Sequence, residues 1–134
     1  MIEQNSTIQP FTLNDQFGKE HNINTLPKFL ICSFGKETGK LISSYFNAQS
    51  SDYLAKHDIK LMADVSGVPS ILRKTIIIPK MKKNSFEILL STEKDFSKQF
   101  PIQDDQLTVL KIEGNVVKEI LFVGDELKLK ETIE

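Results

Sequence analysis

The chain has 134 residues, enough for one hydrophobic core, so we expect a single domain over residues 1–134. Its 17 basic and 18 acidic side chains leave a formal charge of −1, which excludes the global positive field that attracts nucleic acid or an anionic membrane. One cysteine excludes an internal disulfide, a Cys-x-x-Cys pair and a zinc site made of thiolates alone. No apolar run approaches the ~20 residues that cross a bilayer, so we expect no membrane span.

The apolar pattern predicts strands that alternate with helices. Phe29 to Cys32 are apolar on both faces, which is typical of a strand covered on both sides in the middle of a sheet. Residues 68–83 are rich in β-branched side chains, which would suit a strand, but Pro69 near the start and apolar residues at spacings of three and four favour a helix. In chain order we expect first a hairpin over 11–23 with its turn at Asp15 to Gly18, and then a strand at 28–34. A helix of about four turns follows, capped by Thr38 or Glu37 and reaching Tyr53 and Leu54. The remaining elements are a strand at 59–64, the helix at 68–83, a strand at 86–90, a short helix at 93–100, a hairpin over 106–123 and a last helix capped by Asp125.

This order, which ends in a hairpin and a closing helix, resembles the thioredoxin-like fold in its peroxiredoxin and thiol-reductase branch. Residues 11–19, Phe-Thr-Leu-Asn-Asp-Gln-Phe-Gly-Lys, are similar to the lead-in hairpin of that branch, and residues 107–119 are similar to its last hairpin. Residues 64–70, followed by a helix that ends in Lys-Met-Lys-Lys, resemble more narrowly the YtfJ-like group of bacterial proteins. The resemblance implies an α/β fold: a three-layer α/β/α sandwich with a central mixed sheet and an N-terminal hairpin.

The redox determinants of that branch are absent from the sequence. In redox-active relatives the cysteines lie on the turn after the first central strand, and here Thr38 to Leu41 stand roughly in their place. The relatives also carry a cis-proline before the strand that faces the cysteines, where this chain has Asp104-Asp105-Gln106. Pro101 lies earlier, and we expect its peptide bond to be trans. We interpret the chain as a non-catalytic binding or interaction module; the alternative is a single-cysteine thiol enzyme, peroxidase or reductase-like, that uses Cys32.

Two sites follow from this interpretation. Cys32 lies inside a strand, away from any helix end or cation that would stabilise its thiolate, so we expect a small buried hydrophobe rather than a catalytic group. The turn at 35–40 has two glycines, two lysines and a helix start, which would suit an anion, but it does not match a Walker loop and a plain turn is the favoured interpretation. The residues predicted to bind a ligand, in the position of the lost redox site, are Gly35, Lys36, Glu37, Thr38, Gly39, Lys40, Asp105 and Gln106.

The remaining polar residues predict no chemistry. His21 and His57 are isolated and lack a second ligand at metal-binding spacing, so we expect no metal site, and no motif indicates a cofactor. Asp104 and Asp105 are expected in a solvated loop, and the basic residues of 73–83 on a solvated surface. The partner is expected to be a protein or a small molecule and not nucleic acid, with a homodimer left open. The N-terminus lacks a basic start and an apolar run, which favours the cytoplasm, whereas the YtfJ-like resemblance implies the periplasm after removal of a signal peptide.

Overall fold

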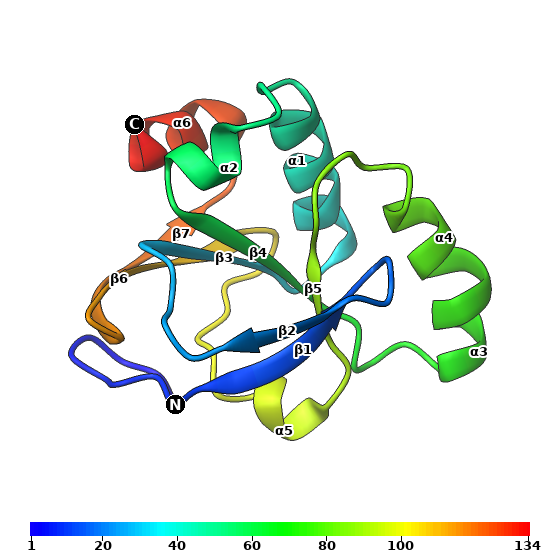
Figure 1. Ribbon diagram of the computed structural model, residues 1–134, viewed down its shortest axis with the longest axis horizontal. Helices are drawn as coiled ribbons and strands as arrows, with labels where there is room; N and C mark the ends of the chain where they lie inside the picture. The colour runs from blue at the N-terminus through cyan, green and yellow to red at the C-terminus, as the bar shows by residue number, and fades with distance from the viewer.

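The computed structural model describes residues 1–134 and is built on a seven-stranded mixed sheet in the order β2-β1-β5-β4-β3-β6-β7 (Figure 1). Strands β3, β4 and β5 are parallel, and the other pairings are antiparallel. The strands are β1 (Phe11–Asp15), β2 (Glu20–Ile23), β3 (Phe29–Ser33), β4 (Ile59–Asp64), β5 (Leu89–Ser91), β6 (Leu107–Glu113) and β7 (Val116–Val123). Both predicted hairpins and the predicted strand at 59–64 are confirmed.

The two faces of the sheet are covered unequally. Helices α1, α2 and α6 lie on one face, and the short α5 lies on the other (Figure 1). The 70–81 helix, made of α3, the π-helical turn η1 and α4, lies beside the sheet near the end of the β1–β2 hairpin. The helices are α1 (Lys36–Asn47), α2 (Tyr53–Lys56), α3 (Ser70–Leu72), η1 (Arg73–Ile77), α4 (Ile78–Met81), α5 (Lys94–Ser97) and α6 (Glu126–Ile133).

The hydrophobic core consists of two clusters, and strand β3 contributes side chains to both. All five of its residues are buried between β4 and β6, as the sequence predicts for a strand in mid-sheet. Because side chains alternate along a strand, Phe29 and Ile31 face the cluster that includes residues of α1 and α6, while Leu30 and Cys32 face the cluster that includes Phe100. The sheet is therefore apolar on both faces, and β3 holds the turn that follows it in a fixed position.

The predicted helix from Thr38 to Leu54 is wrong at both ends. Helix α1 begins at Lys36 with Gly35 as its N-cap, and no side chain caps it. It ends at Asn47, and Tyr53 belongs to the separate helix α2. The polar stretch between the two helices forms a turn in which the hydroxyl of Ser50 donates to Asp52 (Oγ to Oδ1, 2.7 Å), since short polar side chains bond locally and compete with the helix.

The strand predicted at 86–90 begins later, at Leu89. The side chain of Gln16 takes the place of a neighbouring strand before that point. Its Nε2 donates to the carbonyl of Phe86 at 2.7 Å, and its Oε1 accepts from the N–H of Ile88 at 2.7 Å. The buried amide of Gln16 thus supplies hydrogen-bond partners for the backbone of Phe86 and Ile88, so these residues do not need to pair with a neighbouring strand.

The 68–83 segment is helical, as predicted, but it is interrupted by the π-helical turn η1 and contributes no fully buried residue. The N–H of Ile78 donates to the carbonyl of Arg73, five residues earlier. Pro79 has no N–H, so the α-helical bond from this position cannot form. The π-helical turn η1 therefore lies just before Pro79, where an α-helical hydrogen bond cannot form.

Candidate functional site

The turn after β3 is held together by two hydroxyl groups. Ser33 Oγ and Thr38 Oγ1 are 2.7 Å apart, and both lie close to the carbonyl oxygen of Gly35, at 3.1 and 3.0 Å. Ser33 and Thr38 are both buried. Each hydroxyl has a single proton, so the two protons are used within this triangle and neither is free for a ligand.

A cleft of about 310 Å³ lies between this turn and the loop before β6, and we call it the Gly35 cleft. The structure brings four of the predicted binding residues together there, Gly35 and Thr38 on one side and Asp105 and Gln106 on the other. Its lining residues are Phe34, Gly35, Thr38, Ile102, Gln103, Asp104, Asp105 and Gln106.

The other four predicted residues, Lys36, Glu37, Gly39 and Lys40, do not line the cleft. Lys40 lies 3.5 Å from Glu37 in a pair along α1, with both side chains exposed. Asp104 and Asp105 are exposed, as predicted for a solvated loop, and Asp105 has a left-handed backbone with φ of 58°. The loop therefore brings carboxylates, not a thiol partner, to the edge of the cleft.

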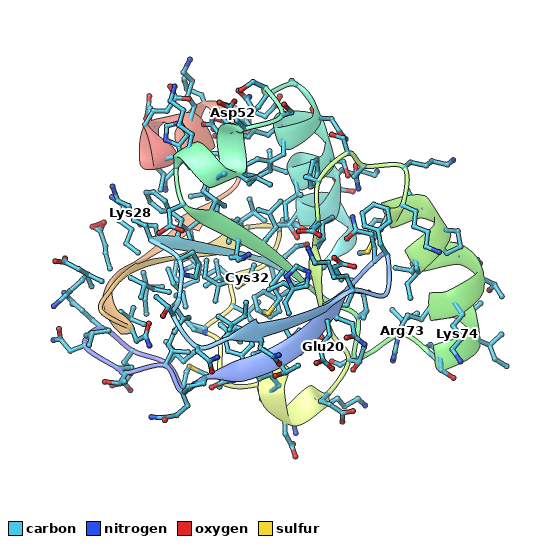
Figure 2. All side chains as sticks on the ribbon, viewed as in Figure 1. Glu20, Lys28, Cys32, Asp52, Arg73 and Lys74 are labelled. Carbon is cyan, nitrogen blue, oxygen red and sulfur yellow. The ribbon has the colours of Figure 1, made fainter.

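Cys32 lies outside the Gly35 cleft, in the sheet interior (Figure 2). Its side chain is 0% exposed and packs in the cluster that contains Leu30, Met62, Phe100 and Leu110. Burial raises the pKa of the Cys32 thiol far above its ordinary value, because a thiolate would be desolvated there. The predicted burial of Cys32 is confirmed. No peptide bond is cis, so the bond before Pro101 is trans, as expected.

The expectation that His21 is isolated is wrong. Its Nε2 lies 2.8 Å from Asp15 Oδ2, across the β1–β2 hairpin, and 3.9 Å from Glu87 Oε2. Burial alone would raise the pKa of Asp15, but bonds from His21, Lys19 and Phe17 outweigh it and hold that pKa below its ordinary value.

These three groups offer one nitrogen and two carboxylates within 4.8 Å, a ligand set that suits a divalent cation. Glu87 Oε2, however, also pairs with Lys19 at 3.2 Å, and Asp15 already accepts bonds on both oxygens.

The alternation of buried positions in the hairpin could have indicated the Asp15–His21 pair. Nothing local in the sequence points to Glu87, which is brought in by the fold. His57 lies at the end of α2.

Comparison with solved structures agrees with this architecture. The chain is similar to StoA from Bacillus subtilis (18% identity, TM-score 0.61, 96% of this chain and 100% of that chain). It is also similar to peroxidoxin BcpB from Mycobacterium tuberculosis (13%, 0.65, 99% and 95%) and to a thiol:disulfide interchange protein from Bacteroides sp. (16%, 0.58, 98% and 91%). The chain has a thioredoxin-like fold.

At these identities the likeness shows the fold and no activity. No family model matches the chain, and no curated protein matches it in sequence. None of its helices combines the length and the apolar character that crossing a membrane requires. The chain has a single cysteine, so its thioredoxin-like architecture lacks a cysteine pair.

Proposed function

We propose that this chain is a non-catalytic binding or interaction module that recognises its ligand at the Gly35 cleft. The observation that carries the proposal is the position of the only thiol. Cys32 is 0% exposed inside β3, and the cleft beside the α1 N-terminus contains no sulfur. A nucleophile needs a stabilised thiolate that a substrate reaches, and Cys32 meets neither condition.

The cleft offers a backbone hydrogen-bond donor on one side and acceptors on the other. The first N–H groups of α1 have no intrahelical acceptor and no side-chain cap, and among them the N–H of Thr38 belongs to a residue that lines the cleft. Across the cleft, Asp104 and Asp105 supply carboxylate oxygens and Gln106 an amide. A ligand that carries both kinds of group, such as a peptide segment or a small polar molecule, fits this arrangement.

The alternative is a single-cysteine thiol enzyme that uses Cys32. It is favoured by the names of solved structures with this fold, which include a thiol:disulfide interchange protein and a peroxidoxin. Such an enzyme would have to open the sheet or displace the Phe100 side of the core to expose the sulfur. The narrower resemblance to the YtfJ-like bacterial group stays a prediction.

Thiol reactivity separates the two functions. We expect the native protein to resist a maleimide reagent and to be labelled only after unfolding in denaturant. Wild type and Cys32→Ser should show the same background rates of disulfide reduction and of peroxide consumption. Rapid labelling of the native protein, or a turnover that Cys32→Ser loses, would favour the thiol enzyme.

Ligand binding at the cleft is tested by blocking it. A Cβ added at Gly35 or at Gly67 meets no atom within 4 Å, but only Gly35 lines the cleft. Gly35→Leu should therefore fill the cleft, and Gly67→Leu is the matched control. In amide NMR spectra, acetylated and amidated tripeptides should shift residues of the Gly35 cleft in wild type and Gly67→Leu, but not in Gly35→Leu. Binding that survives Gly35→Leu would place the ligand elsewhere.

A further inference from the structure

A second cleft, which we call the Arg73 cleft, lies between the β1–β2 hairpin and the 70–81 helix. Its volume is about 570 Å³, within the range of small-molecule sites, and only four of its sixteen lining residues are hydrophobic. It shares no residue with the Gly35 cleft. The polar residues on the hairpin side include Thr12, Asn14 and Glu20, and those on the helix side include Arg73 and Lys82.

Arg73, the only arginine in the sequence, has an unpaired donor here. It begins the π-helical turn η1, and in Figure 2 its side chain lies between the helix and the β1–β2 hairpin. One guanidinium nitrogen, Nη2, donates to the carbonyl of Val68 at 3.0 Å. The neighbouring Nε–H is buried and has no acceptor, and no other buried side-chain nitrogen or oxygen in the structure lacks a partner.

An arginine held in this way favours an oxyanion. Its planar guanidinium presents parallel N–H groups that match the two oxygens of a carboxylate or phosphate. A buried donor without an acceptor is unfavourable, so a ligand oxygen that draws the guanidinium outward and pairs this N–H gains more than it would at an exposed arginine. π-Helical turns occur frequently at functional sites, and this one sets the position of Arg73 on the cleft wall.

The charges around the cleft limit the kind of ligand. Lys74 and Lys82 line the helix side, and neither they nor Arg73 form a salt bridge. Residues 65–86 contain five basic residues and no acidic one. Glu20 and Glu93 line the cleft as well and are also free of salt bridges, so they would repel a polyanion. Asp15, the third acidic residue of the lining, is occupied by His21 and the hairpin turn.

We propose that the Arg73 cleft binds a small molecule through one carboxylate or phosphate group. Arg73 holds the oxyanion, Lys74 and Lys82 add positive charge, and Glu20 and Glu93 face the rest of the ligand. Because Nε is covered by protein atoms, the oxyanion either meets the outer end of the guanidinium or draws it outward. In both cases the environment of the Nε–H changes. The proposal is separate from ligand binding at the Gly35 cleft.

The single arginine makes the test specific. In a ¹⁵N-labelled protein the Nε–H of Arg73 gives the only arginine side-chain signal of its kind, so no assignment is needed. We expect titration with inorganic phosphate or with acetate to shift this signal to saturation, while sodium chloride at equal ionic strength leaves it unmoved. The anion that saturates at the lower concentration identifies the group, phosphate or carboxylate, that the ligand carries.

Variants separate binding from general charge. Backbone amide shifts around Thr12, Lys74 and Lys82 report the same titration when Arg73 is replaced. Arg73→Lys keeps the charge but loses the planar fork, so we expect affinity about tenfold lower, and Arg73→Gln should abolish saturable binding. Lys28→Gln removes a charge outside the cleft and should change nothing.

A chloride response equal to that of phosphate and acetate would overturn the proposal. So would equal affinities in wild type and Arg73→Gln. Gly35→Leu should leave the Arg73 titration intact, so failure at one cleft is distinguishable from failure at the other.

Discussion

The two clefts differ in how far their polar groups are already satisfied. At the Gly35 cleft the hydroxyls of Ser33 and Thr38 bond each other and the carbonyl of Gly35. At the Arg73 cleft a buried guanidinium N–H has no acceptor. Polar groups that satisfy one another fix the shape of a turn, whereas an unpaired buried group gains from a ligand. The first cleft is therefore preformed in shape, and the second is incomplete in its hydrogen bonding.

The supports of the two clefts differ as well. The Gly35 cleft lies at the end of β3, whose residues are all buried, and beside α1, which has four buried residues. The 70–81 helix has no buried residue, and Ile71, Leu72 and Ile76 are exposed. Local opening is easiest where few apolar contacts are buried. We therefore expect the wall of the Arg73 cleft to adjust and that of the Gly35 cleft to stay fixed.

The largest expected effect on the free energy of unfolding comes from replacing an isoleucine by alanine in the segments that support the two clefts. Ile31 is 0% exposed in β3, and Ile71 is 74% exposed in α3. Ile31→Ala should lower the free energy of unfolding by about 3 kcal/mol, because it leaves a cavity in the core. Ile71→Ala should change it by less than about 0.5 kcal/mol, because little apolar surface is lost and alanine favours a helix. Urea denaturation of the two variants measures both values.

A large loss in Ile71→Ala would mean that the 70–81 helix is packed more tightly than its exposure indicates. The contrast between a fixed and an adjustable wall would then fail. Hydrogen exchange at the amides of the 70–81 helix and of α1 gives an independent measurement, with faster exchange expected in the 70–81 helix.

Features set by local sequence were predictable, and features set by distant contacts were not. The hairpin over 106–123 and the Asp125 cap were predicted correctly because turns and caps need particular residues at particular positions. The late start of β5 depends on the side chain of Gln16, far away in the chain. Glu87 joins His21 for the same reason.

The sites divide in the same way. The Gly35 cleft was located from the position of a turn, but only the fold shows that Thr38 lines it while Lys36 does not. The unpaired Nε of Arg73 has no sequence signature, because a basic residue on a helix is ordinarily solvated. The sequence thus predicted the candidate site that the resemblance implies and missed the candidate site that depends on packing.

The second prediction concerns Asp15, which shapes the hairpin wall of the Arg73 cleft. Its side chain is 0% exposed and accepts bonds from the N–H groups of Phe17 and Lys19 and from His21. Asp15→Asn removes the charge that strengthens these bonds, so we expect the free energy of unfolding to fall by about 2 kcal/mol at about pH 7. Urea denaturation of wild type and variant measures the difference.

The same difference should depend on pH in a defined direction. The pKa of Asp15 is lowered by folding from its ordinary value of 3.8, so its stabilisation is complete above that value and is lost as the pH falls through the lower folded-state pKa. The gap between wild type and Asp15→Asn should therefore shrink at about pH 3. A gap that stays constant down to that pH would show that the charge of Asp15 does not support the hairpin wall.

The smallest expected effects on the free energy of unfolding come from removing the hydrogen-bonded hydroxyl of Thr38 and the guanidinium of Arg73, whose Nε–H is unpaired. Thr38→Val removes a buried hydroxyl whose partners remain, so the free energy of unfolding should fall by about 1 kcal/mol. Arg73→Met keeps most of the aliphatic stem and removes both the bond to Val68 and the unpaired Nε–H, so the change should stay within about 0.5 kcal/mol.

Thr132→Val is the control for the hydroxyl, because it removes an exposed hydroxyl that also bonds a backbone carbonyl, and it should cost less than Thr38→Val. A cost for Arg73→Met above that for Thr38→Val would show that Arg73 stabilises the fold itself. A small cost for Arg73→Met, together with loss of the oxyanion titration in that variant, would mean that Arg73 serves the ligand rather than the fold.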